Sequence, residues 1–431
     1  MSAKKAKEKK RSGAGRVILR VLGGILAALL LFLLVMFVIP LTETGDRTAV
    51  EGSTDWMAKL DDDLTLDAIT IPGTHDSGTR YVQLGFFSKC QAMSIRQQLE
   101  AGYRYLDIRL AVDGDGLKLM HGFTDCKTGF GPQSEVLALD AVLEQCYGFL
   151  AAHPTETVLF AVKQEHGEMS VAEFQTLLDR YIQKAPNGWL LTDGIPSLGQ
   201  ARGKLILLRR YPDEAGLGSR AGIPFLWPDQ PGTDDISLNT AASDNGGYTL
   251  WVQDRYEYDS VDKWNAFRAG MDNEAGVKDI SLNFLSTKGS QTYGHPYRYA
   301  RVLNTRLLGT ALPAGSFYGW IVVDFGSGNG DTPQTTTTTT IITTTTTTSS
   351  EQVGTGVLGD ADCNGKNSKY GDGKSFKVSN VPSGVVYEGV IENPVEGAAV
   401  TLWYAVDAEG YPVREETAAL AAATALYYKY I

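Results

Sequence analysis

Cysteine and histidine are scarce in this 431-residue sequence, which holds four of the first and five of the second. No two cysteines have the CxxC spacing, so neither a disulfide scaffold nor a zinc-finger type of site is expected. Cys90, Cys126 and Cys146 lie in the central part of the chain, where at most one disulfide can form. Free buried thiols are an equally good expectation for these three residues.

Positive charge is also lacking outside the N-terminus. The chain has 39 Lys and Arg against 50 Asp and Glu, a formal net charge of −11. Residues 1–20 carry +7, which leaves −18 for the remainder. Because nucleic acids are bound by basic faces, nucleic acid is not expected as a partner. A hydrophobic content of 43% excludes a mostly disordered chain.

Long apolar runs are also lacking, with one exception at residues 21–41, which hold no charged residue. As a helix this stretch would span about 31 Å, enough to cross the hydrocarbon of a bilayer. The basic segment 1–20 is expected to stay in the cytoplasm, so a spacer at 42–55 and everything after it would be exported. The rival interpretation is a cleaved signal peptide. The sequence VIPLTETGD has no small-x-small cleavage site, which favours an uncleaved anchor.

Patterns typical of strands and helices alternate after the spacer. Strands are predicted at 66–71, 103–112, 117–120, 157–163, 204–210, 248–253, 280–285 and 317–325. Helices are predicted at 94–101, 137–152, 171–184 and 261–271. This alternation indicates an α/β barrel or a doubly wound sheet. The Asp-Gly-Asp-Gly turn at 113–116 predicts a hairpin between the second and third strands, which makes a regular barrel doubtful.

The C-terminal part differs in composition. Threonine runs mark a linker at 332–352, which cannot form a core and is a candidate O-glycosylated spacer. In the small region 353–431, residues 360–365 fit the start of a calcium loop. Gly371 stands where that loop needs a carboxylate, so a turn-rich linker is favoured. Residues 393–413 alternate like a pair of strands with a Glu-Gly turn, and resemble the opening of a small β-sandwich repeat.

Charged and imidazole side chains follow several predicted strands where those strands end. They are His75 and Asp76 in IPGTHDSGT, Asp107 and Arg109 in YLDIRL, His121 in LMHG, and Lys163 and Glu165 in VKQE. The alternation of side chains along a strand puts Asp107 and Arg109 on one face. Barrel enzymes place their catalytic groups at the carboxyl ends of the strands, so these residues are candidates for one site.

These motifs together resemble the X-type catalytic domain of bacterial phosphatidylinositol-specific phospholipase C. Later segments match in the same order, namely RGKLILLRRY, FLWPDQ, WVQDRY, ISLNFLST and GWIVVDF. The resemblance covers about residues 56–326 of a predicted catalytic domain at 56–331. It implies an α/β fold, a distorted or incomplete TIM (β/α)8 barrel. With the patterns on either side, the expected chain has one transmembrane helix before this barrel, and a Thr-rich linker and a small β-rich region after it.

The resemblance also implies a mechanism in which the substrate supplies the nucleophile. The inositol 2-hydroxyl attacks the phosphodiester, so the enzyme needs a base, an acid and positive charge, but no cofactor. The implied base is His75 and the implied acid is His121. The other implied catalytic residues are Asp324 beside His75, Asp76 on the His121 side, Arg109 as phosphate clamp, and Asp107, which holds Arg109 or joins the acid relay. Arg109 stands where animal relatives place calcium, which implies that no metal is needed.

Six further residues are implied to hold the inositol ring. They are Lys163, Glu165, Arg210, Asp229, Asp254 and, by stacking, Tyr256. Arg209 stands next to Arg210, and a shift of the family match by one residue would give this role to Arg209 instead. The expected products from phosphatidylinositol are diacylglycerol and inositol 1,2-cyclic phosphate, with glycosyl-phosphatidylinositol anchors as a possible second substrate.

The expected partners are the membrane phospholipid and the chain's own anchor, and the chain is expected to be a monomer. A single-pass protein with its catalytic domain outside a bacterial cell is the favoured location, and a secreted enzyme is the alternative. Two other functions remain open: a surface protein that binds inositol lipids without catalysis, and a barrel enzyme acting on glycerophosphodiesters. The second typically carries a metal-binding cluster near the first histidine, which the sequence lacks.

Overall fold

The computed structural model describes residues 2–43, 54–131, 133–167, 169–232, 241–244, 248–273, 280–290, 294–310, 312, 317–326, 386–392 and 399–405. The chain divides into two compact units. The first consists of Met1–Asn304 and Ala311–Thr343, and the second of Thr305–Thr310 and Thr344–Ile431.

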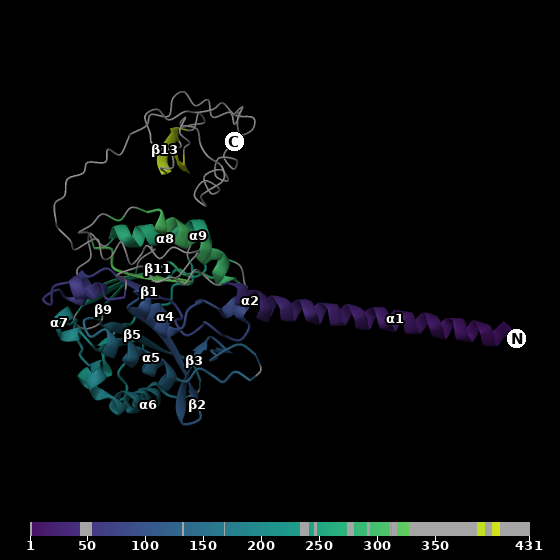
Figure 1. The fold of residues 1–431 in the computed structure, drawn as a ribbon, viewed down its shortest axis with the longest axis horizontal. Coiled ribbons are helices and arrows are strands. Elements are labelled where there is room, and N and C mark those ends of the chain that lie inside the picture. Colours follow the sequence, from purple (N-terminus) through teal and green to yellow (C-terminus); the bar gives the residue numbers. More distant parts are fainter. Residues whose placement is uncertain are drawn as a thin grey trace. The chain divides into compact units, whose positions relative to one another are not determined.

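A mainly parallel sheet forms the centre of the first unit (Figure 1). Its strands run in the order β6 (Trp189–Leu190), β7 (Leu205–Arg209), β5 (Val158–His166), β2 (Tyr105–Asp113), β1 (Ile71–Thr74), β12 (Trp320–Val323), β11 (Ile280–Phe284), β10 (Thr249–Gln253) and β9 (Ala241–Asp244). Neighbours from β6 to β10 pair in parallel, and β9 is antiparallel to β10. Within the described residues no strand pair joins the β10 side to the β7 side. The predicted incomplete α/β barrel is therefore confirmed.

Three short strands lie off this path. β3 (Gly116–His121) is antiparallel to β2 and pairs with β4 (Thr124–Asp125), while β8 (Ile223–Pro224) pairs with β7. Asp113 lies opposite Gly116, so the predicted hairpin is confirmed. The strand predicted at 66–71 is wrong in its first part. Leu66–Ala68 is a 3-10 turn, and β1 begins only at Ile71. Leu66 and Ile69 lie three residues apart and are both buried, which a helical turn allows and a single strand face does not.

Helices lie between the strands. They are α3 (Gly85–Ser88), α4 (Ile95–Glu100), α5 (Leu139–Ala152), α6 (Val171–Lys184), α7 (Leu198–Ala201), α8 (Ser260–Asn273) and α9 (Pro296–Leu308). The four predicted helices are confirmed as α4, α5, α6 and α8. Capping boxes of Ser94 with Gln97 and of Ser170 with Glu173 begin α4 and α6, because each pair satisfies two free backbone N–H groups. The sequence did not predict α9.

Alternate residues of the central strands enter two different cores. The outward-facing ones pack under α4, α5 and α6, and they include Leu106, Ile108, Leu110, Val158, Phe160, Val162, Leu205 and Leu207. The inward-facing ones form the barrel interior, and they include Ile71, Tyr105, Leu159, Ala161, Ile206, Leu208, Leu250, Val252, Leu282, Phe284, Trp320 and Val322. Both faces of the strands are buried, as in other parallel sheets. In this unit α5 and α6 pack near β3, and α8 packs on β10 and β11 (Figure 1).

The N-terminal helix is longer than the uncharged run. α1 spans Ser2–Leu33 and continues through a π-helical turn at Leu34–Val38 into α2 (Ile39–Thr42). The helix over residues 16–42 contains an 18-residue window with a mean hydropathy of 3.0 and is long and apolar enough to cross a membrane. At the end of this helix, Lys89 Nζ donates to the carbonyl oxygens of Pro40 and Glu43, at 2.5 and 3.0 Å. The Glu43 carboxylate also lies 2.6 Å from His295 Nε2.

After residue 343, the described part of the second unit is one antiparallel pair, β13 (Val386–Glu392) with β14 (Ala399–Ala405). One strand predicted within 393–413 is present as β14, but its partner precedes that stretch. The threonine linker, the calcium-loop pattern at 360–371 and Cys363 lie outside the described residues.

Candidate active site

Every second residue of each central strand faces the barrel interior. These inward-facing residues are apolar along the strand (Ile71 and Gly73, Trp320 and Val322, Tyr105, Leu159 and Ala161, Ile206 and Leu208, Leu250 and Val252). At the carboxyl ends of the same strands they become polar, as His75, Asp324, Asp107 and Arg109, Lys163 and Glu165, Arg210, and Asp254. Because the strands are parallel, these ends meet at one edge, where barrel enzymes keep their active sites.

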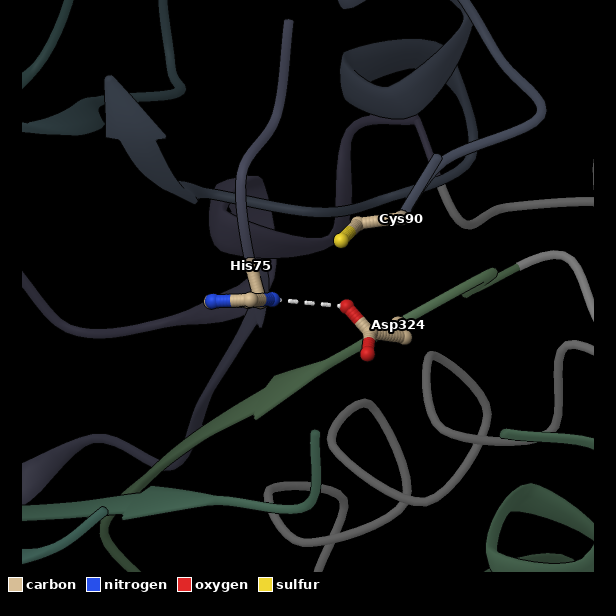
Figure 2. Close-up of side chains that lie close together, drawn as sticks. All are labelled: His75, Cys90 and Asp324. Carbon is tan, nitrogen blue, oxygen red and sulfur yellow. Dashed lines mark hydrogen bonds and ion pairs between the residues drawn. The ribbon is translucent and has the colours of Figure 1, made fainter. Parts of the chain in front are cut away.

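His75 and Asp324 meet across neighbouring strands. Thr74 of β1 lies opposite Val323 of β12, so the next residues of both strands are adjacent. His75 Nδ1 lies 2.8 Å from Asp324 Oδ1 (Figure 2). Burial acts to lower the pKa of His75, but the Asp324 carboxylate more than offsets this and the pKa is raised. The other ring nitrogen, Nε2, lies 2.7 Å from Arg109 Nη2, which can only donate. The proton of His75 therefore resides on Nδ1, and Nε2 is an acceptor.

His121 faces His75 across the site. The two ring centroids are 6.4 Å apart with an interplanar angle of 81°. His121 Nδ1 donates to the Ser88 carbonyl oxygen at 2.8 Å and lies 3.4 Å from Asp76 Oδ2. Both rings are partly exposed, whereas Asp76 is buried. Two imidazoles of different orientation thus border one space.

Arg109 is held by three carboxylates from three segments. Its guanidinium lies 3.0 Å from Asp107, 3.2 Å from Asp76 and 3.4 Å from Glu165. Burial opposes the charge, yet these carboxylates keep the pKa of Arg109 well above its usual value. Burial likewise acts to raise the pKa of Glu165, but Arg109 and Lys163 lower it to about 2. Arg109 and Glu165 are therefore charged at physiological pH, whereas burial raises the pKa of Asp76 despite the nearby Arg109 and His121.

The residues expected to hold a sugar ring form a second group. Arg210 Nη1 donates to Asp107 Oδ1 at 3.1 Å, and its guanidinium lies 3.9 Å from the centre of the Trp227 ring. Arg209 instead donates to the backbone of Tyr211 and Gly222, so Arg210 is the arginine at the site. Lys163 pairs with Glu165 at 2.7 Å.

The far side of this group lies near the surface. Trp227 Nε1 donates to Asp254 at 3.3 Å, and the Tyr256 hydroxyl donates to the exposed Asp229 at 3.1 Å. All six predicted ring-binding residues thus lie among the loops at the carboxyl ends of the strands. Arg210 connects them to the histidine pair through Asp107.

The backbone is strained beside both members of the first histidine–carboxylate pair. Asp76 and Phe325 have φ of 43° and 47°, in the left-handed region that non-glycine residues rarely adopt. The Asp76 N–H donates to Asp107 Oδ2, and the Phe325 N–H donates to the Cys90 carbonyl oxygen at 2.7 Å. Strain of this kind is typical of functional sites and persists because surrounding contacts enforce it.

Glycine at position 73 has a steric reason. A Cβ there would lie 2.7 Å from the Cβ of Tyr105 on the neighbouring strand, closer than real Cβ contacts. The glycine of IPGTH therefore lets β1 approach β2, and the position of His75 depends on that approach.

Sequence reasoning missed the segment 88–91. Ser88 accepts the His121 hydrogen bond, and Gln91 Nε2 donates to the carbonyl oxygens of His75 and Val323 at 2.7 and 3.0 Å. Cys90 points between these elements, beside His75 and Asp324 (Figure 2). No motif marks this run, because its roles use backbone oxygens, an amide and a thiol. Cys90, Cys126 and Cys146 are all free and buried.

A cavity of about 620 Å³ lies beside the site, between the end of the N-terminal helix and the loops after β1 and β4. Its lining is mostly apolar and includes Phe37, Tyr81 and Phe130, but neither catalytic histidine candidate. Phe130 and Phe123 are also largely exposed, at 57% and 75%.

The fold and the site together define a parallel α/β barrel with paired histidines and a clamped arginine at the carboxyl ends of its strands. Residues 70–211 match the family model described as phosphatidylinositol-specific phospholipase C, X domain. The chain is 27% identical over 290 residues to the 1-phosphatidylinositol phosphodiesterase of Staphylococcus aureus strain Newman, covering 63% of this chain and 88% of that protein. It is 29% identical over 265 residues to the enzyme of the same name from Listeria monocytogenes, covering 58% and 73%.

A solved structure of the phosphatidylinositol-specific phospholipase C from Staphylococcus aureus has the same fold. The TM-score is 0.55 at 22% identity, over 67% of this chain and 98% of that one. The resemblance to bacterial phosphatidylinositol-specific phospholipase C that the motifs predicted is confirmed, with residues 70–211 matching the X-domain model of that family.

Proposed function

We propose that this protein is a phosphatidylinositol-specific phospholipase C that acts as a phosphorus–oxygen lyase. It cleaves phosphatidylinositol to diacylglycerol and inositol 1,2-cyclic phosphate. The relatives carry the name 1-phosphatidylinositol phosphodiesterase, which supports the substrate class. The observation that carries the mechanism is the acceptor nitrogen of His75, which has Asp324 behind it and Arg109 in front of it.

In the first step His75 Nε2 takes the proton of the inositol 2-hydroxyl, and the resulting oxyanion attacks phosphorus. Asp324, 2.8 Å from Nδ1, stabilises the imidazolium that forms. The Arg109 guanidinium turns from Nε2 to the non-bridging oxygens of the phosphate, where its planar fork can bind two of them. Asp107 and Asp76 keep the guanidinium at the site during this step.

In the second part of the reaction His121 protonates the glycerol oxygen that leaves. Its Nδ1 is bonded to the Ser88 carbonyl, so Nε2 is the nitrogen that delivers the proton. Water then opens the cyclic phosphate more slowly with the two histidines in reversed roles. This chemistry needs no metal, because Arg109 supplies the positive charge.

Recognition of inositol falls to the second group of polar residues. Lys163, Glu165, Arg210 and Asp254 hold the ring hydroxyls, and Tyr256 with Asp229 forms a platform at the open edge. A sugar with a different hydroxyl pattern would leave a buried charge unpaired, which disfavours its binding. Because Asp229 is exposed, the edge also admits a glycan, so glycosyl-phosphatidylinositol anchors are a second candidate substrate.

We further propose that the protein is a monomer. Its catalytic domain lies outside a bacterial cell and is held at the membrane by an uncleaved N-terminal anchor. Lys89 and His295 bind Pro40 and Glu43 at the end of the N-terminal helix, and all of these contacts would be lost on cleavage after Glu43. The exposed Phe123 and Phe130 suit a domain that works at a lipid surface. Sequencing of the N-terminus of the protein isolated from membranes tests the anchor: a start at or beyond residue 43 would refute it.

Vesicles of phosphatidylinositol treated with a chelator, followed by phosphorus NMR, test the activity. The expected result is an early cyclic phosphate signal, with turnover lowered about 100-fold or more in His75→Ala and His121→Ala. Saturable vesicle binding without any cyclic phosphate would instead identify an inositol-lipid-binding protein. Loss of turnover in chelator would identify a metal-dependent phosphodiesterase.

A further inference from the structure

Three metal-ligating side chains converge at the inner wall of the site. An oxygen of Asp76, the sulfur of Cys90 and a ring nitrogen of His121 all lie within 4.8 Å of one another. Cys90 Sγ is 3.9 Å from His121 Nδ1, and Asp76 Oδ2 is 3.4 Å from the same nitrogen. The proposed reaction assigns no role to the thiol.

These separations are close to those of ligands around tetrahedral zinc. Zinc bonds of about 2.3 Å to sulfur and about 2.0–2.2 Å to nitrogen and oxygen place S and N about 3.6 Å apart, and N and O about 3.4 Å apart. The Cys90 sulfur and the Asp76 oxygen lie within 4.8 Å of each other, so a shift of at most about 1 Å at Cys90 would complete this geometry. The Ser88 carbonyl oxygen, 3.8 Å from Cys90 Sγ and 2.8 Å from His121 Nδ1, can be a fourth ligand once it moves away from that nitrogen.

The Asp76 carboxylate gives independent support. Its side chain is 2% exposed, and its Oδ2 accepts no hydrogen bond from any residue that the structure describes. That oxygen points to the space shared by the two imidazoles, 3.4 Å from His121 Nδ1 and 3.6 Å from His75 Nε2. A buried carboxylate oxygen without a donor is costly unless the carboxyl takes up a proton, which the raised pKa of Asp76 favours, or a cation binds it.

A second triad, His75 with Cys90 and Asp324, shares the same thiol (Figure 2). It is the weaker candidate, because His75 Nδ1 is bonded to Asp324 Oδ1 of the same triad at 2.8 Å and Nε2 to Arg109, whereas His121 Nδ1 is bonded to the Ser88 carbonyl, outside its triad. The Cys90 sulfur can bind only one ion at a time. The expected site is therefore the triad with Asp76, whose Oδ2 accepts no hydrogen bond from a described residue.

We propose that Asp76, Cys90 and His121 bind a zinc ion that inhibits the enzyme. A thiolate and an imidazole select Zn²⁺ over Ca²⁺ and Mg²⁺, which prefer oxygen ligands. On binding, the Cys90 thiol loses its proton to solvent and the Nδ1 proton of His121 moves to Nε2 or is released. Bound zinc removes His121 from its role as general acid. The inhibitory effect rests on the proposed function, whereas the metal site does not.

Cobalt absorption tests the site without any assay of activity. Metal-free full-length protein in detergent is titrated with Co²⁺, and a thiolate-to-cobalt charge-transfer band that Zn²⁺ abolishes is expected. The band should be lost in Cys90→Ser and weakened in Asp76→Asn. It should persist in Cys146→Ala, the matched control, because Cys146 is a free buried thiol in the outer core. Absence of the band in folded wild-type protein would overturn the proposal.

Inhibition is then measured on phosphatidylinositol vesicles, with each variant compared with its own metal-free rate. Zn²⁺ should inhibit the wild type, and Cys90→Ser should raise the half-inhibiting concentration about tenfold or more, since even indirect partners of a metal site contribute that much. Equal zinc curves for Cys90→Ser and Cys146→Ala would overturn the inhibitory role. A cobalt band in a protein without turnover would support the metal site and refute the proposed function instead.

Discussion

The effect of burial on the charge of a lysine side chain can be tested directly at Lys263. This lysine of α8 is fully buried, and its ammonium donates to Gln253 Oε1 at 2.9 Å and to the Arg255 carbonyl at 3.0 Å. Burial lowers its pKa from 10.5 to about 7, and Asp254 and Asp324 offset only part of this effect. We predict that Lys263→Met removes a pH dependence of stability that the wild type has.

The direction follows from proton binding. Because the pKa of Lys263 is lowered in the folded state, the unfolded chain binds more protons between about pH 7 and pH 10. The free energy of unfolding should therefore rise with pH there, by up to about 1.4 kcal/mol per pH unit from this residue. Between about pH 7 and pH 8.5 the difference between wild type and Lys263→Met should change by about 2 kcal/mol.

Urea unfolding of the full-length proteins in detergent, followed by circular dichroism at several pH values, measures this difference. Loss of the two hydrogen bonds of Lys263 shifts the Lys263→Met curve by a constant amount, so only the slope is diagnostic. Contributions from other titrating groups are the same in both proteins and cancel. Parallel curves for the two proteins would refute the conclusion that Lys263 is held with a lowered pKa.

Three further predictions concern arginines. Arg109→Lys should lower kcat on phosphatidylinositol about 100-fold, because an ammonium cannot bind two phosphate oxygens at once; a loss below tenfold would contradict the clamp. Arg210→Lys should raise KM for phosphatidylinositol while the adjacent Arg209→Lys leaves KM unchanged, since only Arg210 faces the site; equal effects in initial-rate measurements would contradict this assignment. Arg104→Met should lower the unfolding free energy by about 3–5 kcal/mol, because it leaves the buried Glu156 without its 2.8 Å partner. Adding Glu156→Gln should recover part of that loss in the same urea experiment, and no recovery would argue against a charge effect.

Much of the site followed from local patterns. The period of two along each strand predicted that Asp107 and Arg109 share a face, and both do lie at the mouth of the barrel. The helix predicted at 171–184 is present as α6 with the same ends, because a capping box begins it and a continuous apolar stripe buries it. Side chains alternate regularly between the two faces of a strand. Once a strand is predicted from the sequence, the face of each of its residues is therefore predicted as well.

Other features depended on which segments the fold brings together. Asp324 is 249 residues from His75 and becomes its partner because β12 pairs with β1. That pairing depends on the packing of interior residues such as Trp320, and on the glycine at 73 that lets β1 approach β2.

By itself, the sequence determined the alternation of strands and helices, the faces of the polar residues, the long apolar N-terminal stretch and, through its ordered motifs, the family. Only the tertiary structure decided that Arg210 rather than Arg209 reaches the site. It alone also brought the Cys90 thiol beside His121, 31 residues away, with the unbonded Asp76 oxygen at the same ring. The physical reason is that these contacts depend on strand register and on a loop that has no periodic pattern, and both are set by packing across the whole barrel.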